Sequence, residues 1–139
     1  MKRSNKIIIG IGIVIVAVVS FHIIFPFFLV GSPLPLYYVQ NEDDNSHEVV
    51  IEVFDPHNIS ILKETHDLSP KDSIEHPKPS SLKFTQVEGD YTFKVTLDGE
   101  ITETFETEVY PHSMVDIGLY DEDSNSGEVT PIYIRVMVM

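Results

Sequence analysis

The chain contains no cysteine and no tryptophan among its 139 residues. Disulfide bonds, thiolate metal sites and thiol catalysis are therefore excluded, because each of them requires a cysteine sulfur. Small exported domains often depend on disulfide bonds for stability. A folded domain of this chain must instead be held together by the packing of its side chains.

Basic residues are also scarce, with 9 Lys and Arg against 22 Asp and Glu and a net charge of −13. Lys2, Arg3 and Lys6 all precede the first acidic residue, so the chain after residue 30 carries a charge of −16 (6 − 22). A field of this sign repels nucleic acid and anionic lipid headgroups. The composition therefore predicts no nucleic-acid partner and favours cations or basic proteins.

Residues 7–30 are uncharged, and Ser20 and His22 are their polar side chains. A helix needs about 20 apolar residues to cross the hydrocarbon core of a bilayer, which is about 30 Å thick. No A-x-A cleavage site of a signal peptide follows the segment. The sequence thus predicts an uncleaved transmembrane helix, with the lipid bilayer as the partner of residues 7–30.

The flanking charges predict an orientation for this helix. Basic residues precede it, and the next one is Lys63; positive charge stays on the cytoplasmic side of a membrane. We therefore expect a basic cytoplasmic tail at 1–6, a Pro-rich spacer at 31–36 and an extracytoplasmic domain at 37–139. The predicted location is the cell membrane, as a single-pass protein with its N-terminus in the cytoplasm.

Apolar and polar residues alternate in short runs after residue 37, which predicts about seven β-strands. In residues 91–97 the alternation predicts that Phe93 and Val95 point inward. A loop longer than two residues after this strand places Phe93 or Val95 opposite Phe105 and keeps apolar residues on one face. Residues 66–81, with three prolines, are predicted to form a long loop, followed by a short strand at 82–87. The last strand is predicted to point Ile132, Ile134, Val136 and Val138 inward.

The strand spacing and the segment YTFKVTLDG, residues 91–99, resemble those of immunoglobulin-like and transthyretin-like exported domains over residues 37–139. The resemblance implies an all-β, immunoglobulin-like sandwich of about seven strands, here preceded by one transmembrane helix, and it implies no catalytic residue. The Cys…Trp…Cys core of true immunoglobulin domains is absent. The layout of one N-terminal helix before a sandwich also resembles accessory proteins of archaeal surface filaments, although no pilin processing motif is present.

Two segments contain candidate metal ligands. Asp121, Asp123 and Asn125 place side-chain oxygens at alternate positions, as calcium-binding loops do. The glycine and the final acid of an EF-hand are missing, and a solvated loop is the alternative interpretation. His112-Ser113-Met114 is similar to the H-x-M element of periplasmic copper(I) chaperones, whose imidazole and thioether ligands suit that ion. Those proteins need a further methionine upstream, and none lies between Met1 and Met114.

Asn58-Ile59-Ser60 fits the acceptor pattern for N-glycosylation and lies next to a predicted turn. No hydrolase, zinc-protease or phosphate-loop motif occurs. The sequence therefore predicts a non-catalytic interaction or structural subunit of a membrane or cell-envelope complex, with a protein partner at a sheet edge or at residues 66–81. The alternative is an exported metal-binding domain that uses calcium at residues 121–128 or copper at His112 and Met114; no other cofactor is predicted.

Overall fold

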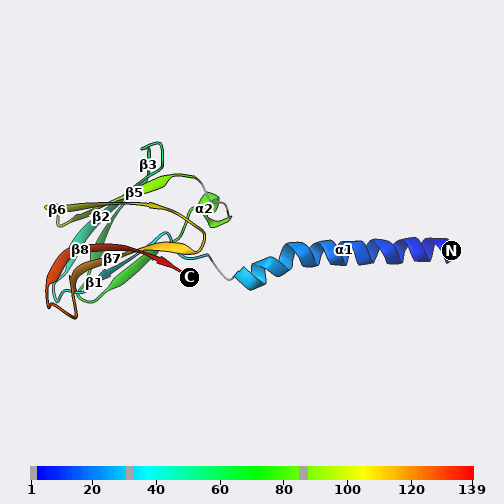
Figure 1. Ribbon diagram of the computed structural model, residues 1–139, viewed down its shortest axis with the longest axis horizontal. Coiled ribbons are helices and arrows are strands. Elements are labelled where there is room, and N and C mark those ends of the chain that lie inside the picture. Colours follow the sequence, from blue (N-terminus) through cyan, green and yellow to red (C-terminus); the bar gives the residue numbers. More distant parts are fainter. Residues whose placement is uncertain (1–2, 31–32, 85–87) are drawn as a thin grey trace. The chain divides into compact units, whose positions relative to one another are not determined.

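The computed structural model describes residues 3–30, 33–84 and 88–139, and the side chains of 3–7, 23, 26–30 and 84 lie outside that description. The chain divides into two compact units, Met1–Ser32 and Pro33–Met139. The first unit contains the helix α1 (Arg3–Val30), and the second contains eight strands and the short helix α2 (Ser80–Phe84). Figure 1 shows both units.

Helix α1 does not meet the requirements of a membrane span. Among the described residues, no helix is both long enough and apolar enough to cross a bilayer. The predictions of a transmembrane helix at 7–30 and of a single-pass location in the cell membrane are therefore wrong. Residues 1–2 and 31–32 of the predicted tail and spacer lie outside the described residues.

The second unit is a sandwich of two four-stranded sheets, which Figure 1 shows as two layers. The first sheet contains, in spatial order, β4 (Ser73–His76), β1 (Tyr37–Asn41), β7 (Ser113–Glu122) and β8 (Val129–Val138). The second sheet contains β3 (Ser60–Leu68), β2 (His47–Phe54), β5 (Asp90–Leu97) and β6 (Ile101–Glu108). The predicted all-β sandwich is confirmed, with eight strands in the described part rather than about seven.

The order of the strands differs from that of an immunoglobulin domain. Constant-type immunoglobulin domains place their first two strands in the same sheet. Here β1 and β2 lie in different sheets, and β1 pairs in parallel with β7, so that Tyr37 lies opposite Val115. All other neighbouring strands pair antiparallel.

The core is formed by the inward rows of both sheets, as the alternation of residues predicts. Phe93, Val95 and Leu97 of β5 are fully buried, and their neighbours on β2 are Val53, Ile51 and Val49. The facing sheet contributes inward residues of β1 and β7, among them Tyr37, Val39, Val115, Ile117 and Leu119. One continuous apolar cluster thus replaces the disulfide that the composition excludes.

The hairpin between β5 and β6 has the register predicted from the sequence. Leu97 pairs with Ile101 across a three-residue loop, and Phe93 lies opposite Phe105. Asp98 and Gly99 adopt left-handed backbone conformations, with φ angles of 51° and 68°. Asp and Gly are residues that tolerate this region, which explains their place in the turn.

Residues 66–81 do not form the predicted long loop. β3 continues to Leu68, and β4 pairs with β1, so that Glu75 lies opposite Tyr38. The predicted strand at 82–87 is also wrong where it is described, because Leu82 belongs to α2 and is buried; residues 85–87 lie outside the described part. β4 forms because its backbone pairs with β1. This pairing cannot be predicted from the residues of β4 alone.

The burial of the core gives a prediction for β5. Replacing Phe93 by alanine should lower the free energy of unfolding by about 3–5 kcal/mol, because it removes a fully buried aromatic ring and leaves a cavity. Lys94, the exposed neighbour in the same strand, is the matched control; its replacement by alanine should change stability by about 0.5 kcal/mol or less. Urea unfolding followed by circular dichroism measures both, and equal effects would contradict the inward position of Phe93.

Candidate functional site

The two open sides of the sandwich differ in how they are covered. On one side lie the edge strands β6 and β8, which contact each other across the two layers. The inward row of β8 becomes steadily more exposed, from Ile132 at 6% to Val138 at 71%. Ile101, which pairs with buried Leu97 and shares its face, is 36% exposed. The predicted inward position of Val138 is therefore correct for its register but wrong for its burial.

The outer edge of β8 presents free main-chain groups. The Met139 N–H donates to the His112 carbonyl at 3.1 Å, continuing the ladder in which Met114 pairs with Met137. Hydrogen-bonded and non-hydrogen-bonded pairs alternate along an antiparallel ladder. The N–H and C=O groups of Val138, Val136 and Ile134 therefore point away from β7, toward the free edge. We call these residues the β8 edge.

The other edge strands carry features that discourage pairing with another chain. β4 has only four residues, β3 carries Lys63 at its exposed centre, and β6 has the exposed Glu103 on its inward face opposite Val95. Short strands and charges of this kind protect sheet edges from association. In β8 the charge is Arg135, which binds Asp116 on the outer face through Nε and Nη2, both at 2.7 Å from Oδ2.

A polar cluster covers the opposite side of the sandwich, between β3 and β4. The Tyr37 hydroxyl donates to Glu64 Oε2 at 3.2 Å and lies 3.2 Å from His66 Nε2. The same carboxylate oxygen lies 3.0 Å from His76 Nδ1. The ring of His76 stacks on Tyr37 with centroids 5.2 Å apart. We call these four residues the Tyr37 cluster; it joins one strand of each sheet through hydrogen bonds.

Tyr37 is a neutral hydrogen-bond donor in this cluster. Burial, followed by the neighbouring charge of Glu64 and the hydrogen bond to it, raises the pKa of Tyr37 above its usual value. A fully buried hydroxyl needs a partner, because an unpaired one costs about 1–3 kcal/mol. The cluster therefore fixes the distance between β1 and β3, and its role is structural.

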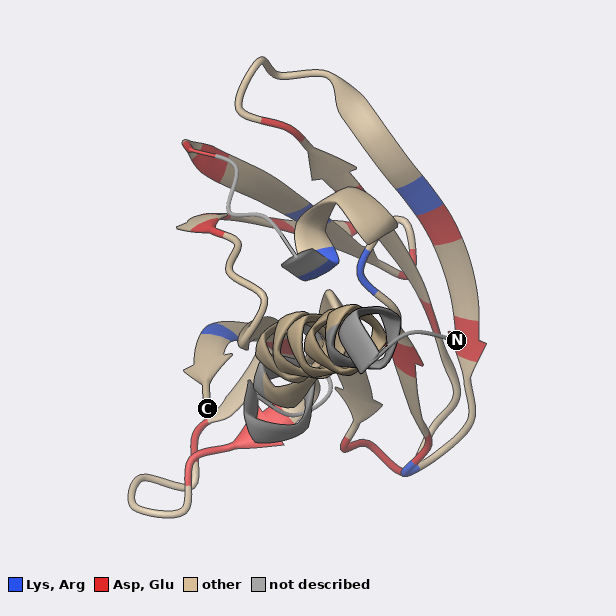
Figure 2. Cartoon of the chain, turned by 90° about the vertical axis from the view of Figure 1, so that its right-hand side faces the viewer, with Lys and Arg blue, Asp and Glu red and all other residues tan. Residues whose placement is uncertain are grey.

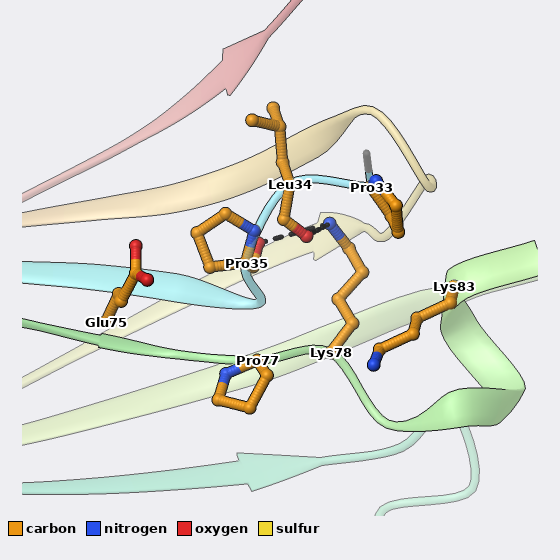
Figure 3. A pocket seen from close by; sticks show the side chains of 7 residues that line it. All are labelled: Pro33, Leu34, Pro35, Glu75, Pro77, Lys78 and Lys83. Carbon is orange, nitrogen blue, oxygen red and sulfur yellow. Dashed lines mark hydrogen bonds between the residues drawn. The ribbon is translucent and has the colours of Figure 1, made fainter. Parts of the chain in front are cut away.

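Lys78 is a buried lysine whose ammonium group is bound by backbone carbonyl groups. Its residue exposure is 3%. Nζ donates to the carbonyls of Leu34 at 2.8 Å, Pro35 at 3.1 Å and Pro111 at 3.3 Å, and also to that of Ser113. Figure 3 shows Nζ pointing toward Leu34 and Pro35. The ammonium thus joins the beginning of the domain to the connection between β6 and β7.

The surroundings of Lys78 act on its charge in opposite directions. Burial lowers the pKa of Lys78 to about 8, whereas the carbonyl oxygens favour the charged ammonium. The adjoining depression, about 390 Å³ in volume, is lined by Pro33, Leu34, Pro35, Glu75, Pro77, Lys78 and Lys83. Because its ammonium is already hydrogen-bonded, Lys78 joins chain segments here rather than acting as a nucleophile.

His47 is bound by carboxylates on both ring nitrogens. Nε2 lies 2.7 Å from Asp43 Oδ2, and Nδ1 lies 2.7 Å from Asp98 Oδ2. Burial opposes a charge on the ring, but the hydrogen bonds to the two carboxylates outweigh it and raise the pKa of His47. The hydrogen bond from His47, with further ones from Asn45 and Asp44, lowers the pKa of Asp43 to about 2. The imidazolium therefore joins the β1–β2 loop to the β5–β6 hairpin.

The predicted calcium ligands lie at the β7–β8 connection. Asp121 is in β7 and pairs with Thr130. Asp123 Oδ1 accepts hydrogen bonds from the N–H groups of Asn125 at 2.7 Å and Ser126 at 3.2 Å, which lower its pKa. Within the described residues, no three His, Cys, Asp or Glu side chains are grouped so that they could hold a metal ion. Calcium binding stays a prediction, and Asp123 already has a local role in closing the turn.

The remaining candidate residues lie on the surface of the sandwich. Asn58 is exposed in the β2–β3 turn with a φ of 61°, and its glycosylation stays a prediction. His112 lies in the turn before β7, and Met114 is the second residue of that strand. Figure 2 shows acidic residues on many strands and loops and few basic ones, in agreement with the composition. The acidic charge is therefore spread over the domain rather than confined to one site.

Sequence reasoning missed two of these features and identified a third only in part. The partners of Lys78 are carbonyl groups, which any residue supplies, so no motif identifies them. The partners of His47 are Asp43 and Asp98, and Asp98 is brought close by the long-range pairing of β2 with β5. The β8 edge could be predicted only in part. Alternation of apolar residues indicates which side chains share a face, but it does not show which strand is the edge strand of a sheet.

Replacing Lys78 by methionine should lower the free energy of unfolding by about 1–3 kcal/mol, because it leaves buried carbonyl oxygens without a donor. Lys83, which lines the same depression, provides the matched control. Its replacement by methionine should change stability by about 0.5 kcal/mol or less. The measurement is urea unfolding at neutral pH, and a K78M variant as stable as wild type would contradict the structural role.

His47 predicts a pH dependence of stability. Its pKa is raised in the folded state, so its contribution is complete below the unfolded value of about 6.5 and is lost as the pH rises through the raised pKa. The H47Q variant should therefore be less stable than wild type in mildly acidic solution, and the difference should shrink at alkaline pH. Exposed His57 is the control, and a pH-independent difference for H47Q would contradict the ion pairing.

Comparison with known protein families and with curated proteins gives no match to this chain. The geometry of the described residues is therefore the basis for the function proposed below.

Proposed function

We propose that this chain is a non-catalytic interaction module whose sandwich binds an extended segment of a partner protein along the β8 edge. The observation that carries the proposal is the exposure of an apolar edge strand without protecting charges at Ile134, Val136 and Val138. Extended peptides add to such edges through main-chain hydrogen bonds, and pockets for alternate side chains give specificity.

Two further observations support the β8 edge over the other candidate surfaces. The opposite side of the sandwich is occupied by the Tyr37 cluster, whose polar groups already bind each other. The outer face of the second sheet is polar, with Thr96 and Thr102 hydrogen-bonded to each other at 3.1 Å. Of the two docking surfaces predicted from the sequence, the proposal keeps the sheet edge. It drops the loop at 66–81, because these residues contain the strand β4.

The type of sandwich is also part of the proposal. The sequence resembles both immunoglobulin-like and transthyretin-like domains, and the separation of β1 and β2 into different sheets does not fit the immunoglobulin order. We infer that the domain is closer to the transthyretin-like type. This inference concerns the fold and implies no ligand.

A photo-crosslinking amino acid tests the proposed docking surface. Placed at Val138 in the full chain, in cells that naturally make the protein, it should form a covalent adduct with a discrete partner protein. Thr104 is the control position, because it is exposed on the outer face of the second sheet. Equal adducts from both positions, or none from Val138 in a folded variant, would overturn the proposal.

A main-chain variant separates strand addition from contact through side chains. Val136→Pro removes a free-edge N–H and leaves the ladder to β7 in place, since proline is tolerated where the N–H faces away from the sheet. It should abolish the adduct from position 138. Val136→Thr keeps the N–H and the β-branched shape and should retain it; loss in both variants would indicate that side chains alone carry the contact.

A further inference from the structure

Three of the four methionines of this chain lie close together at one end of the first sheet. Met114 belongs to β7, and Met137 and Met139 belong to the end of the chain. Met114 pairs directly with Met137 in the β7–β8 ladder. Paired residues in an antiparallel ladder have Cβ atoms about 4.5–5.5 Å apart on the same face, so the two thioether side chains are neighbours.

A backbone hydrogen bond just beyond the end of this ladder brings two further residues together. The Met139 N–H donates to the His112 carbonyl at 3.1 Å. Alternate residues of a strand share a face and are about 6.6–6.8 Å apart, so Met139 continues the side that Met137 occupies. The hydrogen bond brings His112, in the turn before β7, next to Met139. Methionine has three rotatable bonds, which lets the sulfur atoms approach a common point above the ladder.

This group lies on the outer face of the sandwich, where an ion can reach it. Val115 and Ile117 of β7 are buried, so the alternation places Met114 outward. Met137 is 39% exposed and Met139 is 85% exposed. Binding there requires no opening of the core.

The chemistry of these side chains selects a soft monovalent cation. Thioethers favour copper(I) and imidazole suits copper, whereas calcium and magnesium prefer oxygen ligands. The next pair along the ladder, Asp116 and Arg135, forms an ion pair at 2.7 Å, so neither charge is left free to attract or repel a cation. The chain has no cysteine to compete for the ion.

We propose that His112, Met114, Met137 and Met139 form a copper(I) site on the β7–β8 hairpin. No further methionine lies upstream of His112-Ser113-Met114 other than Met1. Here Met137 and Met139 of the neighbouring strand end provide the additional thioethers, because β8 pairs with β7. The site does not depend on the proposed function, because it uses side chains of the outer face, whereas the β8 edge uses main-chain groups.

Competition with the copper(I) chelator bicinchoninate, without oxygen and with the full chain, tests the site. Wild type should withdraw one copper(I) ion per chain. The M114L/M137L variant should bind at least tenfold more weakly, while its folding is preserved because leucine and methionine have similar volumes. H112Q should also weaken binding, and H57Q, which changes an exposed histidine in the β2–β3 turn, should not.

A second measurement locates the ion directly. With methyl-labelled methionine and silver(I) as a redox-inert probe, the methyl resonances of Met114, Met137 and Met139 should shift, while that of Met1 stays unchanged. Unshifted resonances, or copper(I) binding that persists in M114L/M137L and is lost only on removal of other histidines, would overturn the proposal.

Discussion

The contact between the inner faces of the two sheets is the interaction on which the rest of the structure depends. Phe93, Ile51 and Val53 of one sheet are fully buried together with Val39 and Ile117 of the other. Without cysteine, this apolar layer is the main source of stability in the domain, since burial contributes about 25 cal/mol for each Å² of apolar surface removed from water. The polar contacts of Lys78, His47 and the Tyr37 cluster are arranged around it and join loops and edges to a core that is already packed.

The two sides of the sandwich differ in how their polar groups are satisfied. Between β3 and β4, the hydrogen bond from Tyr37 to Glu64 and the contacts of His76 with both residues join the sheets across their border. Between β6 and β8, apolar residues of the inward rows stay partly exposed, and the β8 edge keeps unpaired main-chain groups. The same molecule therefore combines one side whose polar groups are satisfied internally with another whose groups are available to a partner.

The sequence allowed the local pattern to be predicted and left the global arrangement open. Alternation identified the buried row of β5. The need to keep one face apolar limited the partner of Phe105 to Phe93 or Val95, and the structure has Phe93 there. The short strand β4 was not predicted because it depends on pairing with β1. The role of Lys78 was not predicted because its partners are backbone carbonyl groups. The predicted membrane span at 7–30 was wrong, because no helix among the described residues is long and apolar enough to cross a bilayer. For the candidate sites, residue types were visible, but Met137 and Met139 join His112 and Met114 only through strand pairing.

The parallel pairing of β1 with β7 constrains the order in which the domain can form during synthesis. Tyr37 pairs with Val115, 78 positions later (115 − 37), so β1 has no neighbour on that side until most of the chain has been made. The strands β2, β3, β5 and β6 all precede β7 in the chain and pair within their own sheet. Contacts of such long sequence separation slow folding. Until β7 and β8 join β1, the inner face of the β3–β2–β5–β6 sheet lacks most of the apolar layer that covers it in the folded domain, and this face is the surface that a chaperone would shield.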